Sequence, residues 1–265
     1  MAQIGIHFHQ SLNDFLAPEL RDKEIHQRFS RKASIKDMIE SFNVPHTEVA
    51  LILVNGQAVD FDYLVHDTDH IEVYPTLEKC PVSTWLRLRP ESPHPLTFVA
   101  DTNLGKLARY LRLLGFDCLY RNDFDDTTIA EISHDQQRML LTRDRLLLQR
   151  KIIIFGYFVR ADIPKIQIHE VLKKFDLYPT IKPLTRCTGC NGHLAKIAKQ
   201  QIDHRLQPLT KKYYDKFLTC QDCGQIYWQG SHHPRIQVLI NEFIKTDQYL
   251  HRDRKSTRLN SSHRL

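Results

Sequence analysis

Two short apolar segments of the sequence each end at an aspartate. Residues 96–100 are followed by Asp101, and residues 139–143 are followed by Asp144. If both segments are strands of one parallel sheet, their carboxyl ends lie at the same edge, where open α/β sheets bind ligands. Carboxylates gathered there repel one another unless a cation neutralises them, and Mg²⁺ or Mn²⁺ prefers oxygen ligands. The pattern predicts metal-dependent hydrolysis of a phosphodiester.

Three more aspartates lie where they could join the same metal site. Asp125 and Asp126 precede an expected helix, and Asp162 follows the apolar segment 152–159, which we expect to be a strand. A purely structural interpretation stays open for these residues, because aspartate is common at helix N-caps. Asp101 would then cap a helix that begins at Leu104, and Asp162 would cap one that begins at Pro164.

Four cysteines form two Cys-x-x-Cys pairs. Cys187 pairs with Cys190 and Cys220 with Cys223, and 29 residues separate the two pairs. Two such pairs that close on one ion give the tetrahedral four-thiolate site of a zinc ribbon. A closed shell of this kind leaves no open position for substrate, so we expect a structural zinc that helps a small domain fold.

Helical spacing of leucines predicts a helix over 104–114, with Gly115 at its end. A second helix is expected near 125–128, where Thr128 and Glu131 have capping-box spacing, then a turn of helix over 145–150 and a helix from Pro164 to Phe175. Together with the apolar strands this order predicts an α/β domain.

The N-terminal segment predicts a separate α+β unit. A strand at 3–9, a helix from Ser34 to Phe42, a strand at 49–54, a tight turn at Asn55 and Gly56, and a strand at 71–74 follow one another. Residues 1–78 hold 13 acidic and 6 basic side chains, a net charge of −7.

The expected organisation has five parts. They are residues 1–78, a proline-rich linker at 79–95, the α/β domain at 96–180, the zinc ribbon at 181–245 and a tail at 246–265, of which 255–265 resembles translated sequencing-adapter sequence. Residues 79–254 carry a net charge of +10, which favours a polyanionic partner. The sequence holds no membrane span or secretory signal, and its cysteine pairs suit a reducing compartment, so we expect a cytoplasmic protein.

Two resemblances sharpen these expectations. Residues 98–115, 140–145 and 156–162 resemble the PIN-like ribonuclease family named for the Mut-7 carboxyl-terminal domain, over about 96–245. The first 76 residues or so resemble ubiquitin-like β-grasp domains, which precede the nuclease in some members. The resemblance implies an α/β PIN-like (Rossmannoid) parallel-sheet domain between a ubiquitin-like domain and a zinc ribbon. It also implies RNA cleavage with Mg²⁺ or Mn²⁺ held by Asp101, Asp126 and Asp144, beside Asp125 and Asp162. The chain departs from the family pattern at Ile163, where a second acidic residue is expected.

Basic and aromatic residues indicate how RNA would be held. Arg109, Arg112, Arg143 and Arg145 flank the acidic residues and are expected to contact phosphates, although a solvated helix face explains the first two equally well. Lys211 and Lys212 with Tyr227 and Trp228 suit single-stranded RNA, because unpaired bases stack on aromatic rings. The alternative is that Tyr227 and Trp228 pack the ribbon.

The expected function is therefore a metal-dependent ribonuclease. The alternative is a catalytically inactive RNA-binding or adaptor protein on the same fold, which the Ile163 departure favours. Sulfur carriage by the first domain lacks the required Gly-Gly, since residues 74–77 read Tyr-Pro-Thr-Leu, and a protein partner is the better expectation for that domain. An aspartyl phosphatase would need an acid at Asn103.

Overall fold

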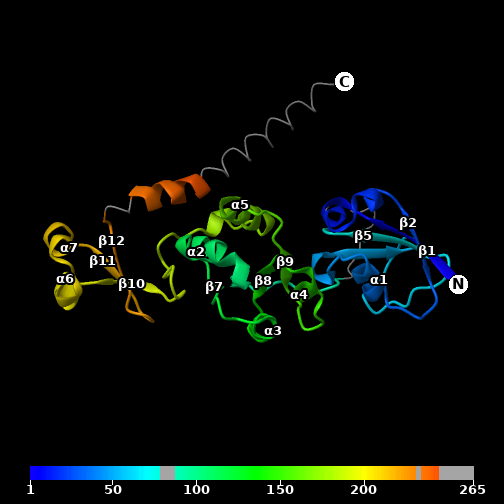
Figure 1. Ribbon diagram of the computed structural model, residues 1–265, viewed down its shortest axis with the longest axis horizontal. Helices are drawn as coiled ribbons and strands as arrows, with labels where there is room; N and C mark the ends of the chain where they lie inside the picture. The colour runs from blue at the N-terminus through cyan, green and yellow to red at the C-terminus, as the bar shows by residue number, and fades with distance from the viewer. Residues whose placement is uncertain (78–86, 231–233, 245–265) are drawn as a thin grey trace, which may run out of the picture. The chain divides into compact units, whose positions relative to one another are not determined.

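The computed structural model describes residues 1–77, 87–230 and 234–244 (Figure 1). They fall into two compact units, and each is described by itself. The first contains Met1–Asp101 and Phe124–Phe158, and the second contains Thr102–Asp123 and the described residues from Val159 onward. The predicted tail at 246–265 and the residues 79–86 of the predicted linker lie outside the described residues.

The N-terminal part of the first unit is a mixed five-stranded sheet. Its strand order is β2-β1-β5-β3-β4, and β1 and β5 run parallel. The bounds are β1 Ala2–Phe8, η1 Gln10–Phe15, η2 Pro18–Leu20, β2 Ile25–Phe29, α1 Ile35–Ser41, η3 His46–Glu48, β3 Leu51–Val54, β4 Gln57–Ala58 and β5 His70–Tyr74. This arrangement agrees with the predicted α+β unit. The edge strand β2 was not predicted, because only Ile25 in it is buried and no alternating apolar pattern marks it.

Helix α1 lies across one face of this sheet (Figure 1). The hydroxyl of Ser34 accepts a hydrogen bond from the backbone N–H of Asp37 at 3.1 Å, so the predicted N-cap is confirmed. Ile35 and Ile39 are fully buried and join the apolar side chains of β1 and β5 in one core. The helix therefore closes the core of the N-terminal domain.

The rest of the first unit contains a parallel sheet with the order β6-β8-β9. The bounds are β6 Phe98–Ala100, α3 Asp126–Asp135, β8 Met139–Thr142, α4 Arg145–Gln149 and β9 Gly156–Phe158. All of β6 and β8 is buried, as expected for a sheet covered on both faces. Two predictions are corrected here. The strand expected at 152–159 is only Gly156–Phe158, because the chain is still turning at Ile153, whose N–H bonds to Arg150 O. The cap of α3 is Asp125, and Thr128 lies inside the helix.

The second unit combines helices with a small antiparallel sheet of order β10-β11-β12. The bounds are η4 Thr102–Leu104, α2 Gly105–Leu113, β7 Cys118–Leu119, α5 Pro164–Lys174, η5 Tyr178–Thr180, β10 Leu194–Ile197, α6 Lys199–Ile202, η6 Asp203–Arg205, α7 Pro208–Tyr213, β11 Phe217–Cys220 and β12 Ile226–Trp228. Residues 234–244 are helical, and the buried ring of Phe243 lies 5.1 Å from that of Tyr110 on α2 and 5.5 Å from that of His169 on α5. This last helix therefore packs on the α2 and α5 pair.

In the described part of the chain, no helix reaches both the length and the hydropathy that crossing a bilayer requires.

Candidate acidic site and cysteine cluster

Asp101 and Asp144 follow the neighbouring parallel strands β6 and β8, and one hydroxyl joins them. Thr142 Oγ1 donates to Asp101 Oδ2 at 2.6 Å and accepts from the backbone N–H of Asp144 at 2.9 Å. The backbone N–H of Asp101 continues the ladder by donating to Leu141 O at 3.0 Å. Thr142 is fully buried and Asp101 is only 6% exposed. The carboxyl edge of the sheet thus holds the two aspartates through a shared, buried contact.

Thr142 is a functional candidate that sequence reasoning missed. The available signal was a hydroxyl at the last position of an apolar strand, two residues before an aspartate. A threonine in that place is common in strands for reasons of propensity alone. Only its two hydrogen bonds distinguish it from an ordinary strand residue.

The structural interpretation of the aspartates needs correction. Asp101 and Asp162 are not N-caps of α2 and α5, since those positions belong to Leu104 and Ile163. Asp144 is a cap instead: its Oδ1 accepts from the N–H groups of Leu146 at 2.8 Å and Leu147 at 3.3 Å. These bonds fix the carboxylate by one oxygen and leave Oδ2 outside the cap.

Asp125 and Asp126 lie at the start of α3, and both are exposed. Asp125 Oδ1 accepts from the N–H of Thr128 at 2.7 Å, and this backbone hydrogen bond holds the pKa of Asp125 below its usual value. Asp126 is the first residue of the helix. Asp162 is exposed and belongs to the second unit. Within the first unit, the Thr142 hydroxyl links Asp101 to the backbone of Asp144.

The four cysteines of the two Cys-x-x-Cys pairs converge. Their Sγ atoms all lie within 4.8 Å of one another, with Cys187 3.7 Å from Cys223 and Cys190 3.4 Å from Cys220. Four thiols at this spacing could bind a zinc ion. Among the described residues, the cysteines are the one group of three or more potential ligands gathered in this way, so the acidic residues do not form a comparable cluster.

The two cysteine pairs have the same backbone geometry. In each, the N–H of the second cysteine points at the Sγ of the first, at 3.4 Å for Cys190 and 3.5 Å for Cys223. The chain then turns through a positive φ, of 79° at Asn191 and 69° at Gly224. A Cβ on Gly192 would lie 2.8 Å from the Sγ of Cys220, so the close approach of the two turns requires a glycine there.

Tyr227 contributes to this cluster. Its hydroxyl lies 3.0 Å from the Sγ of Cys187 and 3.4 Å from Thr188 Oγ1. Burial would raise the pKa of the Cys187 thiol, but the hydrogen bonds from Tyr227 and nearby backbone N–H groups outweigh it and lower that pKa to about 6. Burial and the same contact raise the pKa of Tyr227 to about 12. These hydrogen bonds favour the thiolate form of Cys187, which is the form that binds a metal.

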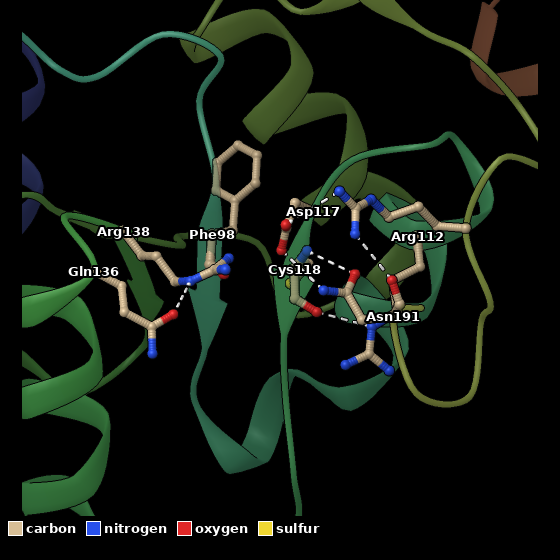
Figure 2. Close-up of polar contacts among 8 residues, drawn as sticks. Phe98, Arg112, Asp117, Cys118, Gln136, Arg138 and Asn191 are labelled. Atoms are coloured by element: carbon tan, nitrogen blue, oxygen red, sulfur yellow. Dashed lines mark hydrogen bonds and ion pairs between the residues drawn. The ribbon is translucent and has the colours of Figure 1, made fainter. Parts of the chain in front are cut away.

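Several basic residues expected to contact RNA are engaged by the protein itself. Arg112 is 2% exposed and donates to the carbonyl oxygen of Cys118 at 2.8 Å (Figure 2). It also donates to the carbonyl oxygen of Gly189 at 2.7 Å. Arg145 donates to Phe15 O at 3.0 Å. Lys211 pairs with Asp203, and the Lys212 ammonium lies 5.4 Å from the centre of the Tyr213 ring. Arg112 is too enclosed to contact a phosphate, so the prediction that it binds RNA is wrong.

Other predicted contacts have side chains that are exposed or half-buried. Arg109 is exposed on α2, Arg143 is half-buried after β8, and Trp228 is 40% exposed at the end of β12. Trp228 also lines a groove of about 520 Å³ together with Tyr227, Lys196 and Lys216. A basic, aromatic surface therefore exists on the small sheet, and Lys211 and Lys212 do not line this groove.

Comparison with known families gives two matches. The model of the Mut7-C RNAse domain matches residues 96–240. The chain belongs to the Mut7-C RNAse domain family. The Mut7-C ubiquitin model matches residues 1–80. No curated protein and no solved structure shows significant similarity to the chain.

The Mut7-C RNAse match includes the acidic edge and the cysteine cluster in one stretch. Within the second unit, the loop around Cys187–Cys190 is bonded to the segment at Asp117 and Cys118, which lies in the same matched stretch. Asn191 Oδ1 accepts from Cys118 N at 3.0 Å and Asn191 Nδ2 donates to Asp117 Oδ1 at 2.8 Å (Figure 2). Asp117 also pairs with Arg186 at 3.1 Å. In this Mut7-C member the cysteine turn is thus part of the nuclease-family domain.

Proposed function

We propose that the chain is a metal-dependent ribonuclease that hydrolyses RNA phosphodiesters at the carboxyl edge of β6 and β8. The observation that carries the proposal is the Thr142 hydroxyl, which joins Asp101 to the backbone of Asp144. Membership of the Mut7-C RNAse domain family supports the same class of reaction. Asp101, Asp144 and Asp126 would hold Mg²⁺ or Mn²⁺, with Asp125 and Asp162 as the remaining acidic candidates.

The donor set fits such an ion. Carboxylate oxygens suit hard divalent cations, which keep several waters and need only one or two protein carboxylates. Asp101 is nearly buried, and a buried carboxylate needs a hydrogen-bond donor or a cation beside it to offset its lost hydration. Thr142 supplies one donor. The cap at Asp144 uses Oδ1, so the second oxygen, Oδ2, would be the one to bind the ion.

The protein residues would act by position and charge. A bound Mg²⁺ or Mn²⁺ supplies a water of lowered pKa and neutralises negative charge on the phosphate. Asp101 is held rigid by Thr142, and Asp144 by the first turn of α4, so neither carboxylate needs to reorganise as the substrate binds. Arg109 and Arg143 would contact phosphates of the strand, while Trp228 with Lys196 and Lys216 would hold single-stranded RNA on the small sheet.

The cysteine cluster would carry a structural zinc and make the C-terminal segment a zinc ribbon. Four thiolates complete a tetrahedral shell and leave no position for a substrate. The ion would fix the two turns that carry Cys187 and Cys220, and through Asn191 it would support the loop at Cys118.

Substitution at the acidic edge tests the proposal. Asp144→Asn removes the charge yet keeps helix capping, because asparagine caps helices as well as aspartate. Thr142→Val removes only the shared hydroxyl. With Mn²⁺ and labelled single-stranded RNA, we expect Asp144→Asn to abolish cleavage and Thr142→Val to reduce it strongly, while exposed Asp135→Asn cleaves like the wild type. Full cleavage by Asp144→Asn with an unchanged melting temperature would overturn the assignment.

A second function has its own support. Asp144 and Asp125 each satisfy helix N–H groups, and Ile163 stands where a further acid is expected, so the same residues suit an inactive RNA-binding or adaptor protein. That function predicts RNA binding without cleavage under any metal, and Asp101→Asn would then leave RNA affinity unchanged or increase it by removing negative charge.

A further inference from the structure

Arg145 is enclosed by groups from the N-terminal domain and from β9. Its guanidinium carbon lies 5.1 Å from the centre of the Phe15 ring and 5.5 Å from that of Phe158. The two rings meet edge to face at 5.2 Å, and Arg145 Nη1 donates to Phe15 O at 3.0 Å. A cation held against two rings and bonded to a carbonyl loses much of its freedom to move.

The position of Arg145 in the chain makes this contact important. It is the first residue of α4 and directly follows Asp144, whose Oδ1 caps that helix. Whatever holds Arg145 therefore also holds the turn that orients the Asp144 carboxylate. Of the two rings that enclose it, Phe15 lies in η1 of the N-terminal domain and Phe158 lies in β9.

Further polar contacts support the same junction. Glu48 is 5% exposed, and its Oε1 accepts from the N–H of Phe158 at 2.7 Å. His46 is 6% exposed; its Nε2 lies 3.0 Å from Ile153 O and its Nδ1 lies 2.7 Å from Glu40 Oε1. Buried polar groups that find partners in this way are costly to separate.

A glycine in β9 permits the close approach. A Cβ on Gly156 would lie 3.3 Å from the Cγ2 of Thr47, tighter than most such contacts, and 2.6 Å from a Leu148 methyl. η3 of the N-terminal domain therefore lies directly on β9. The described contact includes a buried acid, a buried histidine and an enclosed arginine, which together are more specific than an incidental surface contact.

We infer that the ubiquitin-like domain acts in cis as a clamp on α4, and that Arg145 is a positioning residue for Asp144. The catalytic part of this inference rests on the ribonuclease proposed above. The face of the domain formed by η1 and η3 is occupied by its own chain, so a protein partner would bind elsewhere on it. Arg145 serves this clamp instead of a phosphate.

The test compares Arg145→Ala and Arg145→Lys with Lys151→Ala, an exposed cation just beyond α4 that serves as a charge-matched control. The first readout is hydrogen exchange of the amides of Leu146 and Leu147 in the full chain without added Mg²⁺ or Mn²⁺. We expect Arg145→Ala to speed this exchange by about tenfold, as suits the loss of a charge-assisted hydrogen bond and a cation–π contact. Arg145→Lys should be intermediate, since an ammonium lacks the planar fork.

The second readout is steady-state cleavage of RNA with Mn²⁺. Loss of a positioning residue lowers kcat by about tenfold with little change in KM, whereas loss of a phosphate contact raises KM. If Arg145→Ala raises KM but leaves the hydrogen exchange of Leu146 and Leu147 unaltered, the clamp is overturned. It is also overturned if Arg145→Ala matches Lys151→Ala in both exchange and cleavage. If the wild type never cleaves RNA, the proposed function fails, and exchange alone decides: faster exchange in Arg145→Ala supports the clamp, and unaltered exchange overturns it.

Discussion

Replacing Arg112 should weaken both the fold and the binding of zinc. This arginine is almost fully buried, and besides its two short bonds it makes longer ones to Tyr120 O at 3.3 Å and Thr188 O at 3.4 Å. Cys118 and Tyr120 lie at β7, whereas Thr188 and Gly189 lie between two cysteines of the cluster. The side chain therefore joins two segments that are about seventy residues apart in the sequence.

The magnitude follows from the bonds that are lost. Arg112→Met keeps the length of the side chain but removes every donor. Two short bonds from a charged donor are worth about 1.5–3 kcal/mol each, and their carbonyls would stay buried. We expect the free energy of unfolding to fall by about 3–5 kcal/mol, close to the sum of the two lost bonds. Arg112→Lys should cost roughly half as much, since one ammonium cannot bond both segments.

The effect on zinc follows from charge. Burial lowers the pKa of Arg112, while negative charge on Cys118, Cys190 and Cys187 acts in the opposite direction. A zinc ion with four thiolates carries a net negative charge, so the guanidinium stabilises the loaded cluster more than the metal-free thiols. By linkage, Arg112→Met should weaken zinc binding, by about tenfold.

Urea unfolding followed by circular dichroism and zinc release to a coloured chelator measure the two effects. Lys106→Met is the control, because Lys106 is an exposed cation on the same helix. If Arg112→Met matches Lys106→Met in unfolding free energy and in zinc affinity, the guanidinium does not couple the cysteine turn to β7, and the reasoning is wrong.

Three further predictions concern the cysteine cluster, His169 on α5 and the N-cap of α1. Metal analysis should find about one zinc per chain, lost in Cys220→Ser, and a wild type without zinc would contradict the cluster assignment. Burial lowers the pKa of His169, so the unfolded state binds its proton more readily and stability should fall as the pH drops below about 6.5. His169→Gln should flatten this pH dependence in urea unfolding, and an identical slope in both proteins would refute it. Ser34→Ala should cost about 1 kcal/mol of unfolding free energy through the lost cap of α1, whereas Ser34→Asp should cost almost nothing.

The sequence was sufficient to predict the features that depend on local spacing. The paired cysteines, the cap at Ser34 and the strands that end at Asp101 and Asp144 are all visible within windows of a few residues. The match to the Mut7-C RNAse domain and the Mut7-C ubiquitin models agrees with the resemblance of the quoted motifs. Whether a segment forms a helix or a strand could therefore be predicted wherever the spacing of its apolar residues was clear.

The features that were missed depend on partners distant in the sequence. Thr142 bonds an aspartate 41 residues away, and Glu48 bonds the N–H of a residue 110 positions later. No periodicity marks such contacts. Of the aspartates considered as caps, Asp125 does cap α3, but Asp101 and Asp162 do not cap α2 and α5. The cap at Asp144 was not predicted, because any aspartate before a helix looks alike until the backbone shows which N–H groups its oxygen meets.

Composition alone also cannot separate an arginine that binds RNA from one that binds the protein. A guanidinium that can bind a phosphate can equally bind a carbonyl oxygen or an aromatic ring. Arg112 binds carbonyl oxygens of its own chain, and Arg145 packs against an aromatic ring of its own chain. The same holds for Tyr227, whose hydroxyl meets a thiol where a base had been expected. Once these three are assigned to the fold, exposed Arg109 and the groove of Trp228 with Lys196 and Lys216 carry the RNA hypothesis. Charge removal at those positions should therefore weaken RNA binding without the loss of stability expected at Arg112.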